Sequence, residues 1–210
     1  SDEWITTRTG IKERRIAADH EATSDLASQA ATAALRDAGV EPSELDLIVV
    51  ATVTPDMLFP ATACLVQANL GATNAAAFDL SAGCSGFIYA LGVAASCVQS
   101  GAYDRVLVIG ADVLSRITDW SDRSTCVLFG DGAGACLVAP VASGGILATY
   151  LGADGTGGDK LYLPGGGSRQ PLSAGVLQAK QQYIHMAGNE VFKFAVRIMG
   201  DAASEVLKRA

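Results

Sequence analysis

The sequence lacks the histidine and cysteine patterns that are typical of metal sites and of disulfide-bonded proteins. Among its 210 residues there are only two histidines, and its five cysteines are odd in number and show no CxxC spacing. That cysteine pattern argues against a disulfide framework and against a zinc site. Scattered single cysteines are typical of a reducing compartment, so we expect a cytoplasmic protein without a bound metal.

The sequence also lacks an excess of positive charge and any long apolar run. The chain has 15 Lys and Arg against 22 Asp and Glu, a net charge of −7, which argues against a nucleic-acid partner. No apolar run reaches the roughly 18 residues of a membrane span, and the first residues do not resemble a secretory leader. Hydrophobic residues still make up 50% of the chain, enough for a substantial core.

What the sequence does contain is an alternation of strand-like and helix-like segments. Apolar strands are expected at 45–53, 75–80 and 105–111, with a further strand at 144–151. Helices are expected at 22–38, 60–70, 85–99 and 187–210, and a long loop at 154–175. This order predicts an α/β fold whose largely parallel sheet is covered on both faces.

Cys84 is the residue most indicative of chemistry. It follows the apolar segment 75–80, lies among small residues and precedes the helix expected at 85–99. Free N–H groups and the macrodipole at a helix N-terminus favour a thiolate, which is the nucleophilic form of cysteine. The alternative is a buried structural cysteine, the role expected of the other four, which are Cys64, Cys97, Cys126 and Cys136.

A glycine-rich run at 130–134 and the two histidines are weaker signals. The run matches neither the Rossmann nor the Walker spacing, so we interpret it as a tight turn between strands at 125–129 and 135–138 rather than as a phosphate loop. His20 is expected at the surface and His185 in a strand, and both are interpreted as structural.

Several segments together resemble the β-ketoacyl-acyl-carrier-protein synthase III family of the thiolase superfamily. One of them is residues 78–91, around Cys84, and the other four are residues 1–14, 59–64, 129–135 and 186–193, so five segments in all follow the order of the family's signature blocks. The resemblance implies the five-layered αβαβα thiolase fold. Residues 1–142 would form the first half, which carries Cys84, and residues 143–210 the start of the second.

The resemblance is incomplete at both ends. The family's first strand would precede Ser1, and neither a His-Gln-Ala-Asn-like segment nor a Gly-Asn-Thr-Ser-like segment, which hold the family's catalytic His and Asn, occurs in the chain. We therefore expect a fragment of a synthase that does not complete the condensation by itself.

The resemblance also assigns roles to individual residues. Cys84 would be the nucleophile, and Phe59 would reach across a homodimer to the partner's acyl pocket. Phe129 would lie near the acyl pocket, although packing in the core is the alternative for both aromatic residues. The remaining matches are coenzyme A contacts at Trp4, Arg8, Lys12 and Arg123, a pantetheine contact at Asn189 and a carrier-protein contact at Lys193.

The activity implied is an acyl transfer that starts fatty acid synthesis. An acyl-CoA would acylate Cys84, and malonyl-acyl-carrier protein would then condense with the acyl group, with coenzyme A thioester as substrate and no further cofactor. Three alternatives stay open: a priming ketosynthase of secondary metabolism or another superfamily enzyme, a non-catalytic subunit, and a plain coenzyme A-binding domain.

Overall fold

The computed structural model describes all 210 residues, which divide into two compact units. The sheet unit comprises Ile16–Val113 and Asp131–Leu151. The helix–hairpin unit comprises Ser1–Arg15, Leu114–Gly130 and Gly152–Ala210. The expected boundary between halves 1–142 and 143–210 stays a prediction.

The sheet unit is built on four strands in the order β2-β1-β3-β4. They are β1 (Leu47–Ala51), β2 (Ala76–Leu80), β3 (Val106–Val113) and β4 (Asp131–Val138). β1 runs parallel to both β2 and β3, and Leu47 is level with Ala76 on one side and Val106 on the other. Only β4 is antiparallel to its neighbour β3, so the expectation of a largely parallel sheet is confirmed.

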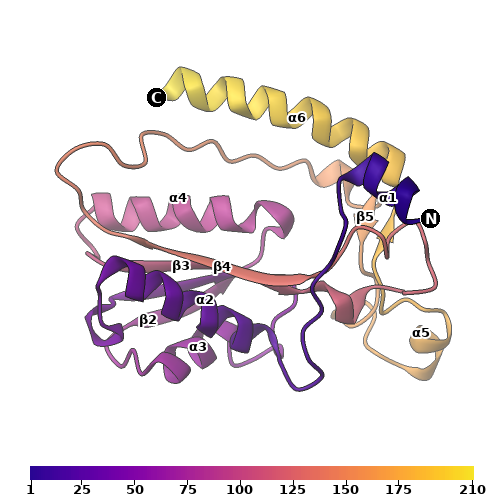
Figure 1. Cartoon of the computed structure of the whole chain (residues 1–210), viewed down its shortest axis with the longest axis horizontal. Helices are drawn as coiled ribbons and strands as arrows, with labels where there is room; N and C mark the ends of the chain where they lie inside the picture. The colour runs from indigo at the N-terminus through magenta and orange to yellow at the C-terminus, as the bar shows by residue number, and fades with distance from the viewer. The chain divides into compact units, whose positions relative to one another are not determined.

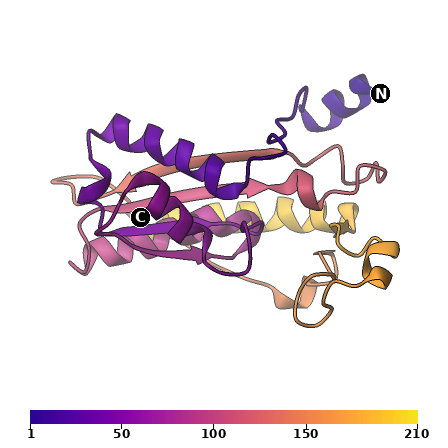
Figure 2. The ribbon, with the colours of Figure 1, turned by 90° about the horizontal axis from the view of Figure 1, so that it is seen from below.

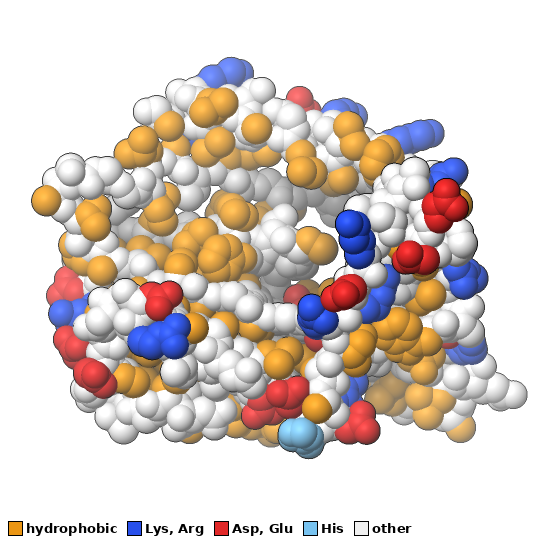
Figure 3. All heavy atoms as spheres, in the orientation of Figure 1, with side chains coloured by type: hydrophobic (Ala, Val, Ile, Leu, Met, Phe, Trp, Pro, Cys, Tyr) orange, Lys and Arg blue, Asp and Glu red, His pale blue; other side chains and the backbone are white.

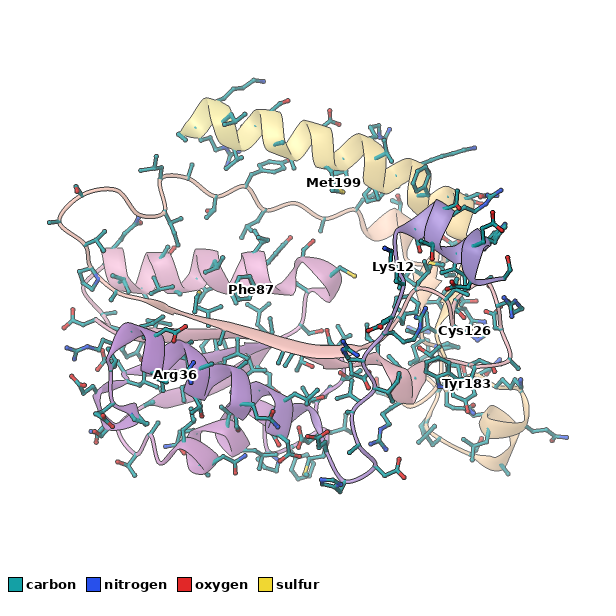
Figure 4. All side chains as sticks on the ribbon, in the orientation of Figure 1. Lys12, Arg36, Phe87, Cys126, Tyr183 and Met199 are labelled. Atoms are coloured by element: carbon teal, nitrogen blue, oxygen red, sulfur yellow. The ribbon has the colours of Figure 1, made fainter.

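Helices cover both faces of this sheet, with α2 (Thr23–Ala38) and α3 (Thr62–Leu70) on one face and α4 (Gly86–Gln99) on the other (Figures 1 and 2). Because side chains alternate along a strand, β1 divides its residues between two cores. Ile48 and Val50 pack with α2 and α3, whereas Leu47, Val49 and Ala51 pack with α4. Phe87, labelled in Figure 4 on the first turn of α4, packs against the second core.

The helix–hairpin unit has little sheet. It contains α1 (Asp2–Thr9), a short hairpin of β5 (Leu161–Tyr162) and β6 (His185–Met186), α5 (Ala174–Gln178) and α6 (Gly188–Arg209). Short 3₁₀ turns lie at Leu114–Ile117 and Gly155–Gly157, and the sheet unit has two more at Pro42–Glu44 and Gly83–Ser85. Apolar side chains are visible along α6 in Figure 3, and Met199 on this helix is 70% exposed. No helix of the structure combines the length and the apolar character that crossing a membrane requires.

Two strand predictions were wrong. The glycine run is not a turn, because β4 continues through the glycines. It pairs residue by residue with β3, from Asp131 opposite Val113 to Val138 opposite Val106. Ladder hydrogen bonds outweigh the weak strand preference of glycine there. Residues 125–128 form turns and Phe129 belongs to no regular element, so no strand lies at 125–129. Residues 144–151 form no strand because no neighbour in the sheet supplies a ladder.

Smaller errors concern the helices and cysteines. The buried stripe of α2 runs through Ala27, Ala31 and Leu35, which pack in the first core. Pro60 precedes α3 instead of lying in its first turn, since the helix begins at Thr62. Cys64 is exposed and not a core residue, and Cys97, Cys126 and Cys136 are only half-buried. His20 is exposed and His185 lies in β6, as expected.

The first core offers a test of this packing. Leu107 is fully buried between β3 and the α2–α3 layer, so Leu107→Ala should lower the free energy of unfolding by about 2–5 kcal/mol through lost burial and a cavity. Leu58→Ala is the matched control, because Leu58 is 87% exposed, and its effect should stay within about 0.5 kcal/mol. Equal shifts of the two urea-unfolding midpoints would contradict the assigned core.

Candidate functional site

Cys84 lies at the corner between β2 and α4. The strand ends at Leu80, Gly83–Ser85 form a 3₁₀ turn, and α4 begins at Gly86. Gly83 has a φ of 54°, a left-handed conformation that glycine adopts without strain, and this reverses the chain just before the cysteine. The thiol is exposed, which rules out the alternative of a buried structural cysteine.

The environment of Cys84 favours a negative charge. α4 is 14 residues long, and the side chain of its N-cap residue Ser85 makes no capping hydrogen bond. The Ser85 and Gly86 N–H groups donate to the Ala82 and Gly83 carbonyls of the preceding turn. The positive end of the helix macrodipole lies next to the cysteine. The corner can therefore stabilise the oxyanion that forms when a cysteine attacks a carbonyl.

The loop that follows β1, residues 52–61, lies at the same edge of the sheet and carries Phe59. Its start is fixed by Asp112 near the end of β3, whose carboxylate accepts hydrogen bonds from the Thr52 hydroxyl, the Val53 N–H and the Thr54 hydroxyl at 3.1, 2.9 and 2.9 Å. The Thr54 hydroxyl oxygen in turn accepts from the Val113 N–H at 2.8 Å. A single carboxylate thus aligns the ends of β1 and β3.

Two further carboxylates fix the rest of this loop. Asp79 of β2 accepts from the N–H groups of Thr62 and Ala63 at 2.8 and 2.7 Å, and so caps the N-terminus of α3. Asp56 accepts from the N–H and hydroxyl of Ser24 at 2.9 and 2.7 Å, which ties the loop to α2. Between these anchors Phe59 is 83% exposed, so it is not a residue of this chain's core.

The remaining predicted residues lie in the helix–hairpin unit. On α1, the guanidinium carbon of Arg8 is 4.9 Å from the centre of the Trp4 ring, a cation–π contact, and Trp4 is 48% exposed. Lys12 is exposed on the segment that follows α1 (Figure 4). The structure thus brings Trp4 and Arg8 together on one short helix.

Arg14 was not among the predicted site residues. Its guanidinium donates from Nη1 to the Phe129 carbonyl at 2.7 Å and from Nη2 to the Val127 carbonyl at 2.8 Å. These two bonds join the segment of α1 to the segment that holds Phe129, which is itself half-buried. Nothing in the local sequence shows where the Arg14 side chain bonds, because both acceptors lie more than a hundred residues away.

Arg123 is exposed in a turn that two aspartates organise. Asp122 accepts from the Ser124 N–H and hydroxyl and from the Thr125 hydroxyl, and these bonds lower the pKa of its carboxyl, those from Ser124 most. Hydrogen bonds from Lys180 and Ser121 lower the pKa of Asp119 to about 2. Asn189 and Lys193 are exposed at the start of α6.

The anchoring carboxylates were also missed, although the sequence holds a signal for them. Asp79 and Asp112 each interrupt an otherwise apolar strand, and a charge in such a place requires partners. The partners are backbone N–H groups and threonine hydroxyls from a loop, which pattern reasoning cannot match to a given carboxylate.

Comparison with known proteins settles the family. The family model of 3-oxoacyl-[acyl-carrier-protein] synthase III matches residues 78–155, a range that includes the Cys84 corner and β4. The β-ketoacyl-[acyl-carrier-protein] synthase III of Caldanaerobacter subterraneus is 64% identical over all 210 residues. The chain belongs to the 3-oxoacyl-[acyl-carrier-protein] synthase III family.

Solved structures agree with this synthase III assignment. The 3-oxoacyl-[acyl-carrier-protein] synthase III of Aquifex aeolicus matches the whole chain with a TM-score of 0.87 at 53% identity, and the chain covers 63% of it. The priming β-ketosynthase of the R1128 polyketide pathway matches the whole chain with a TM-score of 0.92 at 39% identity. The expected thiolase-like α/β fold is therefore confirmed. The chain spans 63–65% of the length of the curated synthase III relatives from Caldanaerobacter and Natranaerobius.

The pair Asp119–Lys180 gives a pH-dependent prediction for this synthase III chain. The Lys180 ammonium lies 2.8 Å from the Asp119 carboxylate and is the main cause of its pKa of about 2. Because folding depresses this pKa, the pair stabilises the fold above the unfolded carboxyl's pKa of about 4 and loses its effect as the pH falls towards 2. In Lys180→Met, an NMR titration should show Asp119 protonating at higher pH than in the wild type. An unchanged midpoint would contradict the pairing.

Proposed function

We propose that the chain carries the nucleophile of an enzyme that condenses an acyl-CoA primer with malonyl-acyl-carrier protein to start fatty acid synthesis. The observation that supports this proposal most directly is the exposed Cys84 thiol at the uncapped N-terminus of α4. Relatives that carry the name β-ketoacyl-[acyl-carrier-protein] synthase III at 53–64% identity supply the reaction class, an acyl transfer.

In the first stage the Cys84 thiolate attacks the carbonyl carbon of the acyl-CoA thioester. A bond forms between the cysteine sulfur and that carbon, and the tetrahedral intermediate places negative charge on its oxygen. Backbone N–H groups of the corner, including that of Cys84, would donate to this oxyanion. The intermediate collapses by breaking the bond to the coenzyme A sulfur, which leaves as a thiolate and takes up a proton.

In the second stage malonyl-carrier protein loses carbon dioxide, and the electron pair of the broken bond forms an enolate. The enolate carbon attacks the acyl-Cys84 carbonyl, and the cysteine leaves as a thiolate, so that the product is a 3-oxoacyl thioester on the carrier protein. The family resemblance assigns the donors for the enolate to a His and an Asn in segments that are not among these 210 residues. No residue of this chain is therefore assigned to that step.

The substrate contacts are proposals carried over position by position. Trp4 and Arg123 would stack on the adenine, Arg8 and Lys12 would meet the phosphates, and Asn189 would line the path of the pantetheine. The exposed Trp4 ring, which Arg8 already contacts on one side, supports this placement.

Phe129 and the partner subunit's copy of Phe59 would bound the acyl group in a homodimer, and Lys193 would meet the acidic carrier protein. The 83% exposure of Phe59, on a loop held by three carboxylates, supports an intermolecular role for this residue. We further propose a cytoplasmic location, in line with the free cysteines.

A priming ketosynthase of secondary metabolism is the second candidate. The R1128 priming β-ketosynthase has the same fold over the whole chain, with a TM-score of 0.92. Both candidates acylate the same cysteine, so the range of acyl-CoA substrates that acylates Cys84 is what separates them.

The first stage is testable by intact mass. Incubation with acetyl-CoA should add one acetyl group to the wild-type chain, and Cys84→Ala should abolish the adduct because the nucleophile is gone. Cys64→Ala is the matched control, since Cys64 is also exposed, and it should keep the adduct. An adduct that persists in Cys84→Ala would overturn the assignment of the nucleophile.

A further inference from the structure

We propose that Arg14 is a positioning residue for the nucleotide of coenzyme A. It would hold the segment that carries Trp4, Arg8 and Lys12 at a fixed distance from the segment that carries Arg123 and Phe129. The inference rests on the proposed function, since it concerns how acyl-CoA is bound before it reaches Cys84.

The contacts of Arg14 join two segments that are more than a hundred residues apart in the sequence. Its two η nitrogens donate to the Phe129 and Val127 carbonyls at 2.7 and 2.8 Å, which are the distances of strong, charge-assisted hydrogen bonds. Val127 is buried, with 8% exposure, so its carbonyl lies where a replacement donor from water is hard to supply. The planar guanidinium meets both acceptors at once, which the single ammonium of a lysine cannot reproduce.

Gly130 shows that the two segments also touch through their backbones. A Cβ added at Gly130 would lie 3.1 Å from the Arg15 carbonyl oxygen and 3.3 Å from the Arg14 Cβ. The first of these is a backbone atom, which cannot rotate away as a side chain would. A side chain at residue 130 would therefore push the backbone of Arg14 and Arg15 away by a few tenths of an ångström.

Local hydrogen bonds within each segment connect Arg14 and its acceptors to the proposed ligand contacts. After α1 the chain folds back on the helix, because the Ile11 N–H donates to the Thr9 hydroxyl at 3.1 Å and the Gly10 N–H donates to the Thr6 carbonyl at 2.9 Å. On the other side, the Cys126 N–H donates to the Asp122 carbonyl at 3.0 Å, which ties the turn of Arg123 to the residues before Val127. Loss of the Arg14 bonds would therefore change the spacing between the two sets of nucleotide contacts.

Arg15 provides a matched control. It is the next residue and carries the same charge, but its side chain is 82% exposed and pairs with the exposed Glu13 at 3.1 Å. Arg15→Met removes one positive charge from the same part of the surface without touching the Val127 and Phe129 carbonyls. Arg14→Lys makes the opposite change, since it keeps the charge and removes the two-pronged bond.

The experiment compares two acetyl donors on the same chain. Acetyl-CoA carries the nucleotide, whereas S-acetyl-N-acetylcysteamine presents the same thioester without it. The rate of Cys84 acetylation is followed by intact mass over a range of donor concentrations, and thermal unfolding confirms that each variant is folded. For Arg14→Lys and Gly130→Ala, the half-saturating concentration of acetyl-CoA should rise roughly tenfold, the effect of about one charge-assisted hydrogen bond.

The same variants should react with S-acetyl-N-acetylcysteamine at the wild-type rate, and Arg15→Met should behave as the wild type with both donors. An equal loss with both donors would overturn the proposal, because Arg14 would then support the fold in general. Wild-type affinity for acetyl-CoA in Arg14→Lys would overturn it too, because the charge alone would suffice. If neither donor acetylates the wild-type chain, the proposed function itself fails, a result distinct from the other two.

Discussion

Strand β1 hydrogen-bonds to β2 on one side and to β3 on the other, and all three run in the same direction. Their carboxyl ends therefore meet at one edge of the sheet, which is where open α/β sheets hold their functional groups. Cys84 follows β2 there, the loop with Phe59 follows β1, and Asp112 lies near the end of β3. Because β1 is buried on both faces, this edge is fixed by the two cores on either side of it.

Carboxylates then convert a sheet edge into a defined site. Asp79 and Asp112 each accept at least two hydrogen bonds from residues 52–63. Asp56, which lies within this segment, accepts two from Ser24 of α2. Asp79 also makes the surroundings of the two exposed cysteines different. It caps the N-terminus of α3, where Cys64 lies, whereas the N-cap residue of α4, next to Cys84, makes no capping hydrogen bond. Cys64 thus lies near a helix N-terminus with a capping carboxylate, and Cys84 near one without it.

The sequence was sufficient to predict the fold class, the three parallel strands and the corner at Cys84, because apolar strands and amphipathic helices follow from local patterning. It was not sufficient for β4, where pairing with β3 overrides the turn preference of Gly132 and Gly134. Arg14 and Asp112 could not be found, since their partners are distant in sequence and become neighbours only in the folded chain.

The comparison of Cys84 with Cys64 tests most directly whether the corner activates its thiol. Both cysteines are exposed, so limited alkylation with iodoacetamide at neutral pH, followed by peptide mass mapping, measures their relative rates within one sample. An uncapped helix N-terminus should make Cys84 react about tenfold faster than Cys64, whose helix is capped by the Asp79 carboxylate. Equal rates, or a faster Cys64, would contradict activation by the strand–helix corner.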